Sequence, residues 1–113
     1  MANNVKLLDK FFEAENKRDW PAFEGFLHPD VMWFIHAEDS HLPVVGRAEY
    51  MERIYDGYKV NEEIASFVCQ GVDVSESGNR IVANLQYSDG TRSVCIFDYE
   101  DSLIRWKHEF LIK

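Results

Sequence analysis

Residues 10–53 read KFFEAENKRDWPAFEGFLHPDVMWFIHAEDSHLPVVGRAEYMER, and this stretch indicates the fold more clearly than any other part of the chain. Its first residues continue a helix that Asn3 or Asn4 can cap, with apolar side chains at mostly helical spacing. Asp19 can cap a second, short helix that buries Phe23, Phe26 and Leu27. We expect this helix to end at residues 28–30, because the residue before a proline avoids helical geometry.

The rest of the stretch predicts a strand, a loop and a third helix. Residues 31–35 are apolar enough for a buried strand, and residues 37–43 are polar and predicted to form a loop. Gly46 follows a short extended Val44-Val45 pair, and a helix is expected from about Arg47 to Tyr58, where apolar residues recur at helical spacing. Helices thus dominate the first half of the chain.

The second half reads as strands separated by turns. We expect strands over residues 64–74, 80–87, 91–99 and 103–112, the first of them bulged at Gly71. Helices followed by antiparallel strands are typical of an α+β fold. With 113 residues, the chain is long enough for one domain with one core, and we expect residues 1–113 to form a single domain.

Composition argues against several classes of partner. The chain has 12 basic and 20 acidic residues, a net charge of -8, so the basic footprint of a nucleic-acid binder is missing. The same charge disfavours an anionic membrane surface, and no apolar stretch is long enough to span a bilayer. The first residues lack the apolar core of a signal peptide, so we expect Cys69 and Cys95 to be reduced and the protein to be cytoplasmic.

A hairpin at Asp89-Gly90 sets the expected register of the sheet. A two-residue turn there is the strongest short hairpin signal, and it would place Gln86 opposite Ser93 and Asn84 opposite Cys95 on one face. Both faces of this hairpin carry apolar groups, so we expect one face to line a core or pocket and the other to meet a partner. The alternative is a short strand that tolerates stray polar residues near its edge.

The order of these elements resembles the start of the nuclear transport factor 2-like superfamily, which includes SnoaL-like polyketide cyclases and ketosteroid isomerase. The resemblance rests on Asp19-Trp20-Pro21, on the run from Phe26 to Asp30, on the strand after it and on Gly46-Arg47. It implies a cone-shaped barrel: a curved antiparallel sheet packed on three N-terminal-half helices that encloses a pocket. It also implies a homodimer through the convex face of the sheet. It implies no reaction, since the fold hosts many chemistries and non-enzymes.

The catalytic residues of ketosteroid isomerase are not matched in this chain. Those enzymes use an aspartate base, with a tyrosine and a protonated aspartate that hold the oxyanion. The matching positions are Ile35, Phe11 and a position near Ser93. Isoleucine cannot take a proton and phenylalanine cannot donate a hydrogen bond, so this mechanism is not expected.

Glu109 is the one carboxylate that matches a catalytic position. Limonene-epoxide-hydrolase-like relatives use an arginine and two aspartates, and those positions fall near Val82, Asn84 and Glu109. If Glu109 faces the pocket, burial would raise its pKa and Lys107 would lower it, and the carboxylate could act as a general base or acid. The alternative is an exposed glutamate that pairs with Arg105 or Lys107 in water.

The last strand permits two assignments of its faces. Alternation alone would place Trp106, His108 and Phe110 inside. The family resemblance implies instead that Lys107, Glu109 and Leu111 look into the pocket. Both interpretations remain open, and we favour the family register.

A polar cluster within residues 36–41 could in principle bind a metal. It contains His36, Glu38, Asp39 and His41, but it matches no helical ligand pattern and has no distant partner, so we expect a solvated loop or a lid over the pocket. We therefore expect neither a metal nor a cofactor.

The sequence thus predicts a small-molecule-binding domain. We expect it to bind a largely apolar organic ligand and to carry out cofactor-independent acid–base chemistry, with Glu109 catalytic and Trp33, Ile35, Asn84, Gln86 and Ser93 lining the site. The alternative is a non-catalytic dimerisation or protein-interaction module on the same fold.

Overall fold

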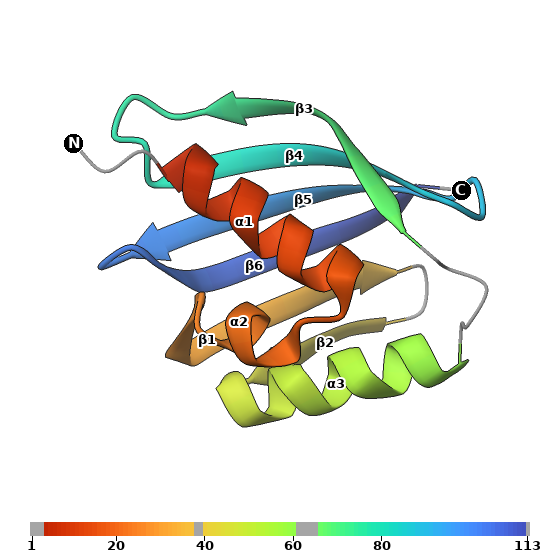
Figure 1. The fold of residues 1–113 in the computed structure, drawn as a ribbon. Helices are drawn as coiled ribbons and strands as arrows, with labels where there is room; N and C mark the ends of the chain where they lie inside the picture. Colours follow the sequence, from red (N-terminus) through yellow and green to blue (C-terminus); the bar gives the residue numbers. More distant parts are fainter. Residues whose placement is uncertain (1–3, 38–39, 61–65, 113) are drawn as a thin grey trace.

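Three helices pack on one face of a curved six-stranded sheet (Figure 1). This computed structural model describes residues 4–37, 40–60 and 66–112. The helices all lie in the N-terminal half, and four strands make up the C-terminal half, so the expected α+β class is confirmed. In chain order the elements are α1 (Asn4–Lys17), α2 (Trp20–Glu24), β1 (Leu27–Ala37), β2 (Ser40–Val45), α3 (Arg47–Val60), β3 (Phe67–Val74), β4 (Arg80–Tyr87), β5 (Arg92–Glu100) and β6 (Leu103–Ile112).

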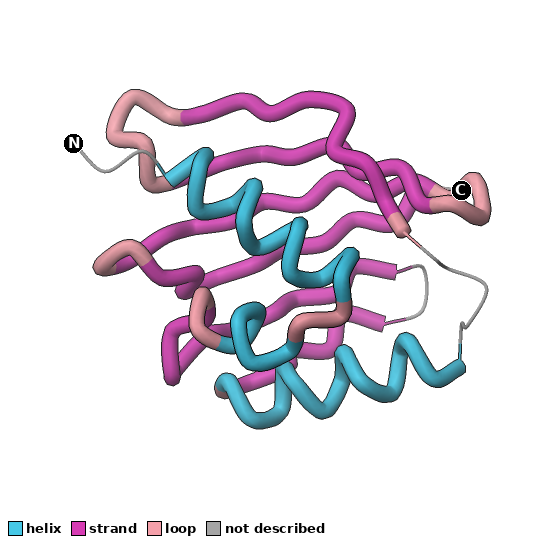
Figure 2. The backbone as a smooth tube through the Cα atoms, in the orientation of Figure 1, coloured by secondary structure: helices cyan, strands magenta, loops and turns pink. Residues whose placement is uncertain are grey.

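The strands follow the spatial order β2-β1-β6-β5-β4-β3. Neighbours are antiparallel except β1 and β6, which are parallel. β2 and β3 are the two edges and do not pair with each other, so the sheet is open and the expectation of a barrel is wrong. Figure 2 shows the helices in cyan on one side of the magenta sheet, and no described element covers the other face.

The helices begin and end close to the expected positions. α1 buries Leu8, Phe11 and Phe12, the side chains that fall on its apolar stripe. α2 begins after Asp19, whose carboxylate accepts a hydrogen bond from the Ala22 backbone N–H at 3.4 Å, a typical N-cap contact. These local signals are short-range in the sequence, which explains why they were sufficient to locate both helices.

The connection from α2 into the sheet differs from the expectation. α2 ends at Glu24, and residues 28–30 belong to β1 instead of ending the helix. Pro29 lies where the β1–β6 register shifts, and a bulge is a place where a strand tolerates a residue without an N–H. The predicted loop over residues 37–43 is also wrong: Ala37 ends β1, and Ser40–Val45 form the edge strand β2. Residues 38 and 39 lie outside the described residues.

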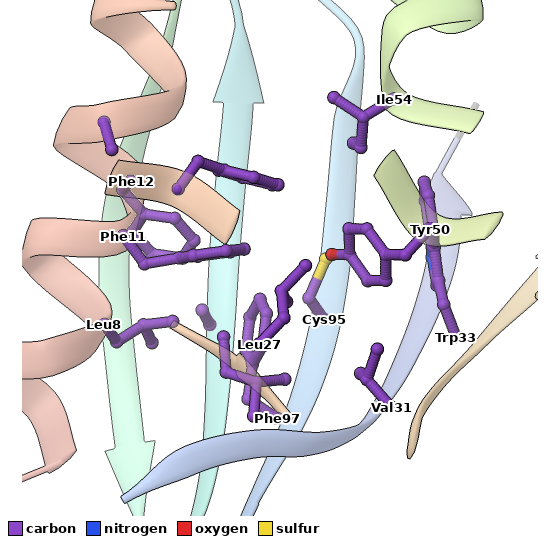
Figure 3. Packing of buried hydrophobic residues seen from close by; sticks show 14 of the residues in the cluster. Leu8, Phe11, Phe12, Leu27, Val31, Trp33, Tyr50, Ile54, Cys95 and Phe97 are labelled. Atoms are coloured by element: carbon purple, nitrogen blue, oxygen red, sulfur yellow. The ribbon is translucent and has the colours of Figure 1, made fainter. Parts of the chain in front are cut away.

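The core lies between α1, α2, α3 and the concave face of the sheet (Figure 3). Its centre is aromatic: the Phe11 ring stacks on Phe23 at 4.4 Å between centroids and meets Phe97 edge-on at 6.1 Å. Offset and edge-on pairs are the arrangements that aromatic rings favour. Figure 3 shows Phe11 and Leu8 projecting from α1 toward Leu27 and Phe97, which joins the first helix to the sheet.

The β4–β5 hairpin has a different turn from the one expected. Gly90 has a φ of +90°, its N–H donates to the Tyr87 carbonyl at 2.9 Å, and the Tyr87 N–H donates to the Thr91 carbonyl at 2.8 Å. This is a three-residue loop with glycine in the left-handed position, which is a common hairpin connection. The Asp89 carboxylate stabilises it by accepting from the Thr91 N–H at 2.9 Å.

The extra turn residue shifts the register of the hairpin by one position. Ser93 pairs with Leu85 instead of Gln86, and Asn84 pairs with Val94 instead of Cys95. The expected register is therefore wrong. A shift of one residue exchanges the faces of one strand relative to the other, because side chains alternate with a period of two.

Two further irregularities change the pairing register within the sheet. The register of β3 against β4 shifts between Cys69 and Gly71, so the predicted bulge at Gly71 is confirmed. In β6, Asp98 pairs with Trp106 and Tyr99 pairs with Ile104, which leaves Arg105 as an extra residue. Ile104 and Lys107 consequently point to the same, buried side of the sheet.

Two glycines provide a matched test of the backbone before and within α3. Gly46 has a φ of +91° and Gly57 has an ordinary helical backbone, and a Cβ added at either would meet nothing within 4 Å. We expect Gly46→Ala to lower the free energy of unfolding by about 1–2 kcal/mol, because L-residues avoid the left-handed region. Gly57→Ala should raise it by about 0.5–1 kcal/mol, since alanine is the better helix former. Urea denaturation of both variants checks the opposite signs, and equal signs would contradict this explanation.

Candidate functional site

A cavity of about 470 Å³ lies between the concave face of the sheet and the helices α1 and α3. Its volume falls within the range of roughly 300–1,000 Å³ that small-molecule sites occupy. Apolar side chains from both helices and from three strands form much of its wall: Phe12, Trp33, Ile35, Ile54, Leu85 and Leu111. Such a lining favours a ligand with a largely apolar body.

Three charged side chains of this wall are buried. Glu15 comes from the last turn of α1, and Lys107 and Glu109 come from β6. They are 8%, 6% and 9% exposed, respectively. Charged side chains are rarely buried to this degree without partners, and perturbed ionisable groups in a cavity are typical of functional sites.

Lys107 lies at the centre of an aromatic cage. Its Nζ lies 4.4 Å from the centroid of the Trp33 ring and 3.1 Å from the Tyr50 hydroxyl oxygen, to which it donates a hydrogen bond. Trp33 and Phe97 are its cross-strand neighbours on β1 and β5, so the sheet register places the ammonium between their rings. A cation over an aromatic face is attracted by the negative face of the ring.

The charge of Lys107 is balanced by carboxylates. Its Nζ lies 3.5 Å from Glu109 Oε1. Burial alone would lower the pKa of Lys107, but Tyr50, Glu109 and Glu15 outweigh that effect and hold its pKa above the ordinary lysine value. Lys107 is therefore a persistent cation, and Glu109 is its partner in a buried ion pair.

Glu15 occupies a second, separate polar position in the cavity. The Tyr58 hydroxyl of α3 donates a hydrogen bond to Glu15 Oε2, and this contact joins α3 to α1. Burial raises the pKa of Glu15, while Lys107 and the Tyr58 hydrogen bond oppose the rise. The C-terminal end of a helix also disfavours an anion. Glu15 thus holds a proton more readily than an ordinary glutamate does.

A short chain of polar side chains continues from the cavity into the sheet. The hydroxyls of Tyr87 and Ser93 are 3.3 Å apart, and Ser93 Oγ lies 3.6 Å from Cys95 Sγ. Burial raises the pKa of Cys95 to about 12, so its thiol stays protonated and is a poor nucleophile. Only the Tyr87 end of this chain lines the cavity, so Ser93 positions Tyr87 from below.

The structure brings together three of the six residues expected at the site. Trp33, Ile35 and Glu109 line the cavity, and Ile35 is the cross-strand neighbour of Glu109. The family register of the last strand is correct, because Lys107, Glu109 and Leu111 all face the cavity. An exposed, water-paired Glu109 is ruled out by its burial.

The other three expected residues do not line this cavity. Ser93 is buried beneath it, whereas Asn84 and Gln86 are exposed on the opposite face of the sheet. Gln86 hydrogen-bonds there to the Gln70 side chain. The three-residue turn explains this placement, since it reverses the faces of β4 relative to β5.

Sequence reasoning missed Glu15 and Tyr58 as site residues. Glu15 falls on the apolar stripe of the first helix, and a carboxylate in such a stripe is the signal that could have identified it. Tyr58 carried no comparable signal, because its partner lies 43 positions away in the chain.

Glu15 predicts a pH dependence of stability with a defined sign. A carboxyl whose folded pKa is raised above its unfolded value of about 4.5 binds its proton more tightly in the folded state, so stability falls as pH rises through the folded pKa. Glu15→Gln keeps the acceptor for Tyr58 and cannot ionise. We expect this variant to be more stable than the wild type at neutral pH, with the difference vanishing below pH 4.5. Denaturation curves across this range test the prediction, and a variant less stable at every pH would contradict it.

The described residues contain no group of three or more histidine, cysteine, aspartate or glutamate side chains that could hold a metal ion. Within the polar cluster at residues 36–41, His36 belongs to β1 and His41 to β2 instead of forming the expected loop or lid, and Glu38 and Asp39 lie outside the described residues. In its buried part, the described cavity offers the carboxyls of Glu15 and Glu109 and the ammonium of Lys107, and the phenols of Tyr58 and Tyr87 also line it.

The fold is similar to that of nuclear transport factor 2-like proteins of known structure. The structure of Bal32a from a soil-derived mobile gene cassette superposes with a TM-score of 0.87 over 98% of this chain and 90% of that one, at 12% identity. An NTF2-like protein of unknown function from Burkholderia pseudomallei K96243 matches with a TM-score of 0.75 over 99% and 92% of the two chains, at 20% identity. Ketosteroid-isomerase-like and SnoaL-like proteins are also among the similar structures.

The chain belongs to the SnoaL-like domain family, whose model matches residues 8–105. No curated protein matches the chain in sequence. Among the described residues, none of the helices has the length and hydropathy needed to cross a membrane. The low identity to the solved structures means that they establish the fold and leave the chemistry to be argued from the cavity itself.

Proposed function

We propose that this protein binds a small, largely apolar organic molecule and catalyses a cofactor-independent proton transfer on it. The observation that carries the proposal is the burial of Glu15, Lys107 and Glu109 in the wall of an otherwise mostly apolar cavity. Burying charges costs free energy, and natural cavities retain such groups mainly where chemistry or recognition needs them.

The two carboxyls have different environments, which assigns them different roles. Glu109 is paired with the Lys107 ammonium and, among the described residues, accepts no side-chain hydrogen bond, so its carboxylate can take a proton from a ligand. Glu15 holds its proton more readily and hydrogen-bonds to Tyr58. Environments that separate two carboxyls in this way are the pattern by which one site supplies both a base and an acid.

In the proposed step, the Glu109 carboxylate accepts a proton from the bound molecule and becomes a carboxylic acid. Glu15 donates its own proton to a second atom of the same molecule. Glu109 then returns its proton to a different atom of the ligand and Glu15 recovers a proton, which restores both groups and leaves the ligand changed. The step transfers protons between protein and ligand and involves no oxidation or reduction. Isomerisation, cyclisation, dehydration and hydrolysis can all proceed through such proton transfers. The Lys107 ammonium stays charged throughout and stabilises negative charge that develops nearby.

Native mass spectrometry of the gently purified full chain tests the binding part of this proposal. A retained organic mass, released on denaturation, would identify the ligand class, and isothermal titration with that compound would give its affinity. We expect Gln86→Ala, on the opposite face of the sheet, to leave affinity unchanged.

Glu109→Gln tests the proton-transfer role once a ligand is known. General acid–base groups contribute about 10²–10⁴-fold to a rate, so turnover should fall by at least 100-fold. Ligand affinity should change much less, because the amide keeps the shape of the carboxylate. Unchanged turnover in Glu109→Gln would contradict the role of base.

A specific surface favours a second property, self-association through the uncovered face of the sheet. We propose that a second copy of this chain covers it, forming a homodimer. Neighbouring strands place Phe34, His108, Ile96 and Val82 in one cross-strand row there. Arg80 and Asp98 on the next row are paired with each other at 2.7 Å. Two chains that each carry a net charge of -8 repel each other. The uncovered face is suited to contact between copies because its side chains are largely apolar and because the charges of Arg80 and Asp98 neutralise each other.

The proposed dimer also accommodates the alternative of a non-catalytic module. A chain that dimerises but retains no ligand and shows no turnover would fit that alternative. Cys69 and Cys95 are both free thiols, which supports the proposed cytoplasmic location.

A further inference from the structure

Gly57 is a helical glycine that the backbone itself does not require. It lies inside α3, which continues to Val60, and its φ is not positive. Among the described residues, an added Cβ would meet nothing within 4 Å, so no neighbouring segment needs the close approach that glycine allows. Glycine weakens a helix interior relative to alanine, and one of its uses is to let a ligand approach the backbone closely.

The space in front of Gly57 belongs to the cavity. Gly57 lines it together with Arg53, which lies one helical turn earlier on the same face of α3. Ile54 and Tyr58 line it from the neighbouring row of the helix. Ile54 is buried, whereas Gly57 and Arg53 are exposed. Gly57 is therefore part of the mouth of the cavity, and Ile54 is part of its buried interior.

The mouth is apolar where β6 contributes to it. Leu111 and Ile112 line the cavity and are 51% and 40% exposed. The buried charges of Glu15, Lys107 and Glu109 lie in the interior instead. An apolar mouth over a polar interior suits a ligand whose polar end lies inside and whose apolar end reaches outward, because the ligand then covers the exposed apolar side chains.

The charged residues at the exposed part of the cavity do not require a polar ligand end there. The Asp89 carboxylate already accepts hydrogen bonds from the Thr91 hydroxyl at 2.6 Å and from the Thr91 N–H at 2.9 Å. Arg53 and Arg92 are exposed, so their guanidinium groups can stay in water while their aliphatic stems flank an apolar group.

We propose that Gly57 is a specificity-determining residue, whose missing side chain leaves a notch through which the apolar tail of the ligand leaves the cavity beside Leu111. This inference rests on the binding function proposed above. It adds the class of ligand: an elongated molecule with one polar, reacting end, which lies beside Glu109, and an unbranched apolar tail. A side chain at position 57 would fill the notch and limit the length of the tail.

A series of para-alkylphenols, from para-cresol to para-hexylphenol, provides the probes. Each has one uncharged polar end and a tail that grows by one methylene at a time. Isothermal titration of the full chain gives the affinities, and methyl NMR signals of Ile54 and Leu85 in the cavity and of Ile96 on the uncovered face show where the probes bind. We expect the wild-type affinity to rise by about fourfold for each methylene that leaves water, with shifts at Ile54 and Leu85 and none at Ile96.

Gly57→Leu fills the notch with a side chain that suits a helix interior. This variant should bind para-cresol like the wild type and para-hexylphenol at least about 10-fold more weakly, which is the value of about two buried methylenes. Gly57→Ala should give a smaller loss for the same long probe. Asp56→Leu is the matched control, because Asp56 is the exposed neighbour of Gly57 on α3 and does not line this cavity, and it should bind the whole series like the wild type.

The ratio of the long-probe to the short-probe affinity decides the outcome. Unchanged binding of para-cresol shows that the site is intact in a variant, so a folding defect cannot imitate the expected result. A Gly57→Leu protein with the wild-type ratio overturns the role of Gly57, and so does a wild-type affinity that does not rise with tail length. Either result leaves the binding function standing if para-cresol shifts Ile54 and Leu85. If no phenol of the series binds at the cavity, the binding function itself is contradicted and this inference falls with it.

Discussion

Replacing Lys107 with methionine is expected to lower the free energy of unfolding by about 3–5 kcal/mol, the usual cost of removing one partner of a buried ion pair. Methionine fills a similar volume among the aromatic rings, so little of this loss comes from packing. The loss arises because Glu109 keeps its charge in a buried site while its partner at 3.5 Å has gone. Chemical denaturation at neutral pH measures the effect.

Two further variants show whether the charge is the cause. Adding Glu109→Gln to Lys107→Met removes the uncompensated carboxylate, so the double variant should recover most of the lost stability. Lys17→Met removes an exposed lysine that pairs with Glu13 at the end of α1, and it should leave stability essentially unchanged. A double variant as unstable as Lys107→Met alone would show that packing, and not charge, dominates at this position.

Phe11→Ala is expected to be comparably severe, with a loss of about 3–5 kcal/mol. Phe11 is fully buried and contacts Phe23, Phe97 and Phe26 at centroid distances between 4.4 and 6.1 Å. Truncation leaves a cavity that these rigid rings cannot close, and it removes the contact by which α1 and α2 are joined to the sheet.

Phe110→Ala is the matched control for the core variant. The same truncation is made on the same residue type, but Phe110 is 40% exposed on the uncovered face. We expect a much smaller loss in the monomer, because less apolar area leaves water at this position. Urea denaturation of both variants gives the comparison, and equal losses would contradict the assignment of the core to the concave side.

The helices could be predicted because their signals are local. The cap at Asp19, the stripe of α1 and Gly46 before α3 each act within a few residues, and the structure places all three helices where these signals indicate. Only Val44-Val45 of the edge strand β2 was predicted to be extended, because Ser40 and His41 are polar and Pro43 follows them. The strand is held by pairing with β1, and an edge position tolerates such residues.

The register of β4 and β5 could not be predicted from Asp89-Gly90 alone. Two- and three-residue loops both place glycine in the left-handed conformation, and the sequence does not distinguish them. The length of this loop determines which face each side chain occupies. Asn84 and Gln86 lie on the uncovered face of the sheet, and Ser93 lies beneath Tyr87. Glu109 was expected to face the cavity because the family register, and not alternation, was followed in β6, and it does line the cavity.

Arg105, the extra residue of the β6 bulge, has a consequence for the inside of the molecule. If β6 ran from Ile104 without interruption, Trp106, His108 and Phe110 would follow Ile104 onto the helix side, and Lys107 and Glu109 would point away from it. Three large rings would then occupy the space in front of α1 and α3. The bulge at Arg105 thus decides which side chains of β6 face the helices, and with them whether the space in front of α1 and α3 is filled by rings or remains open to a ligand.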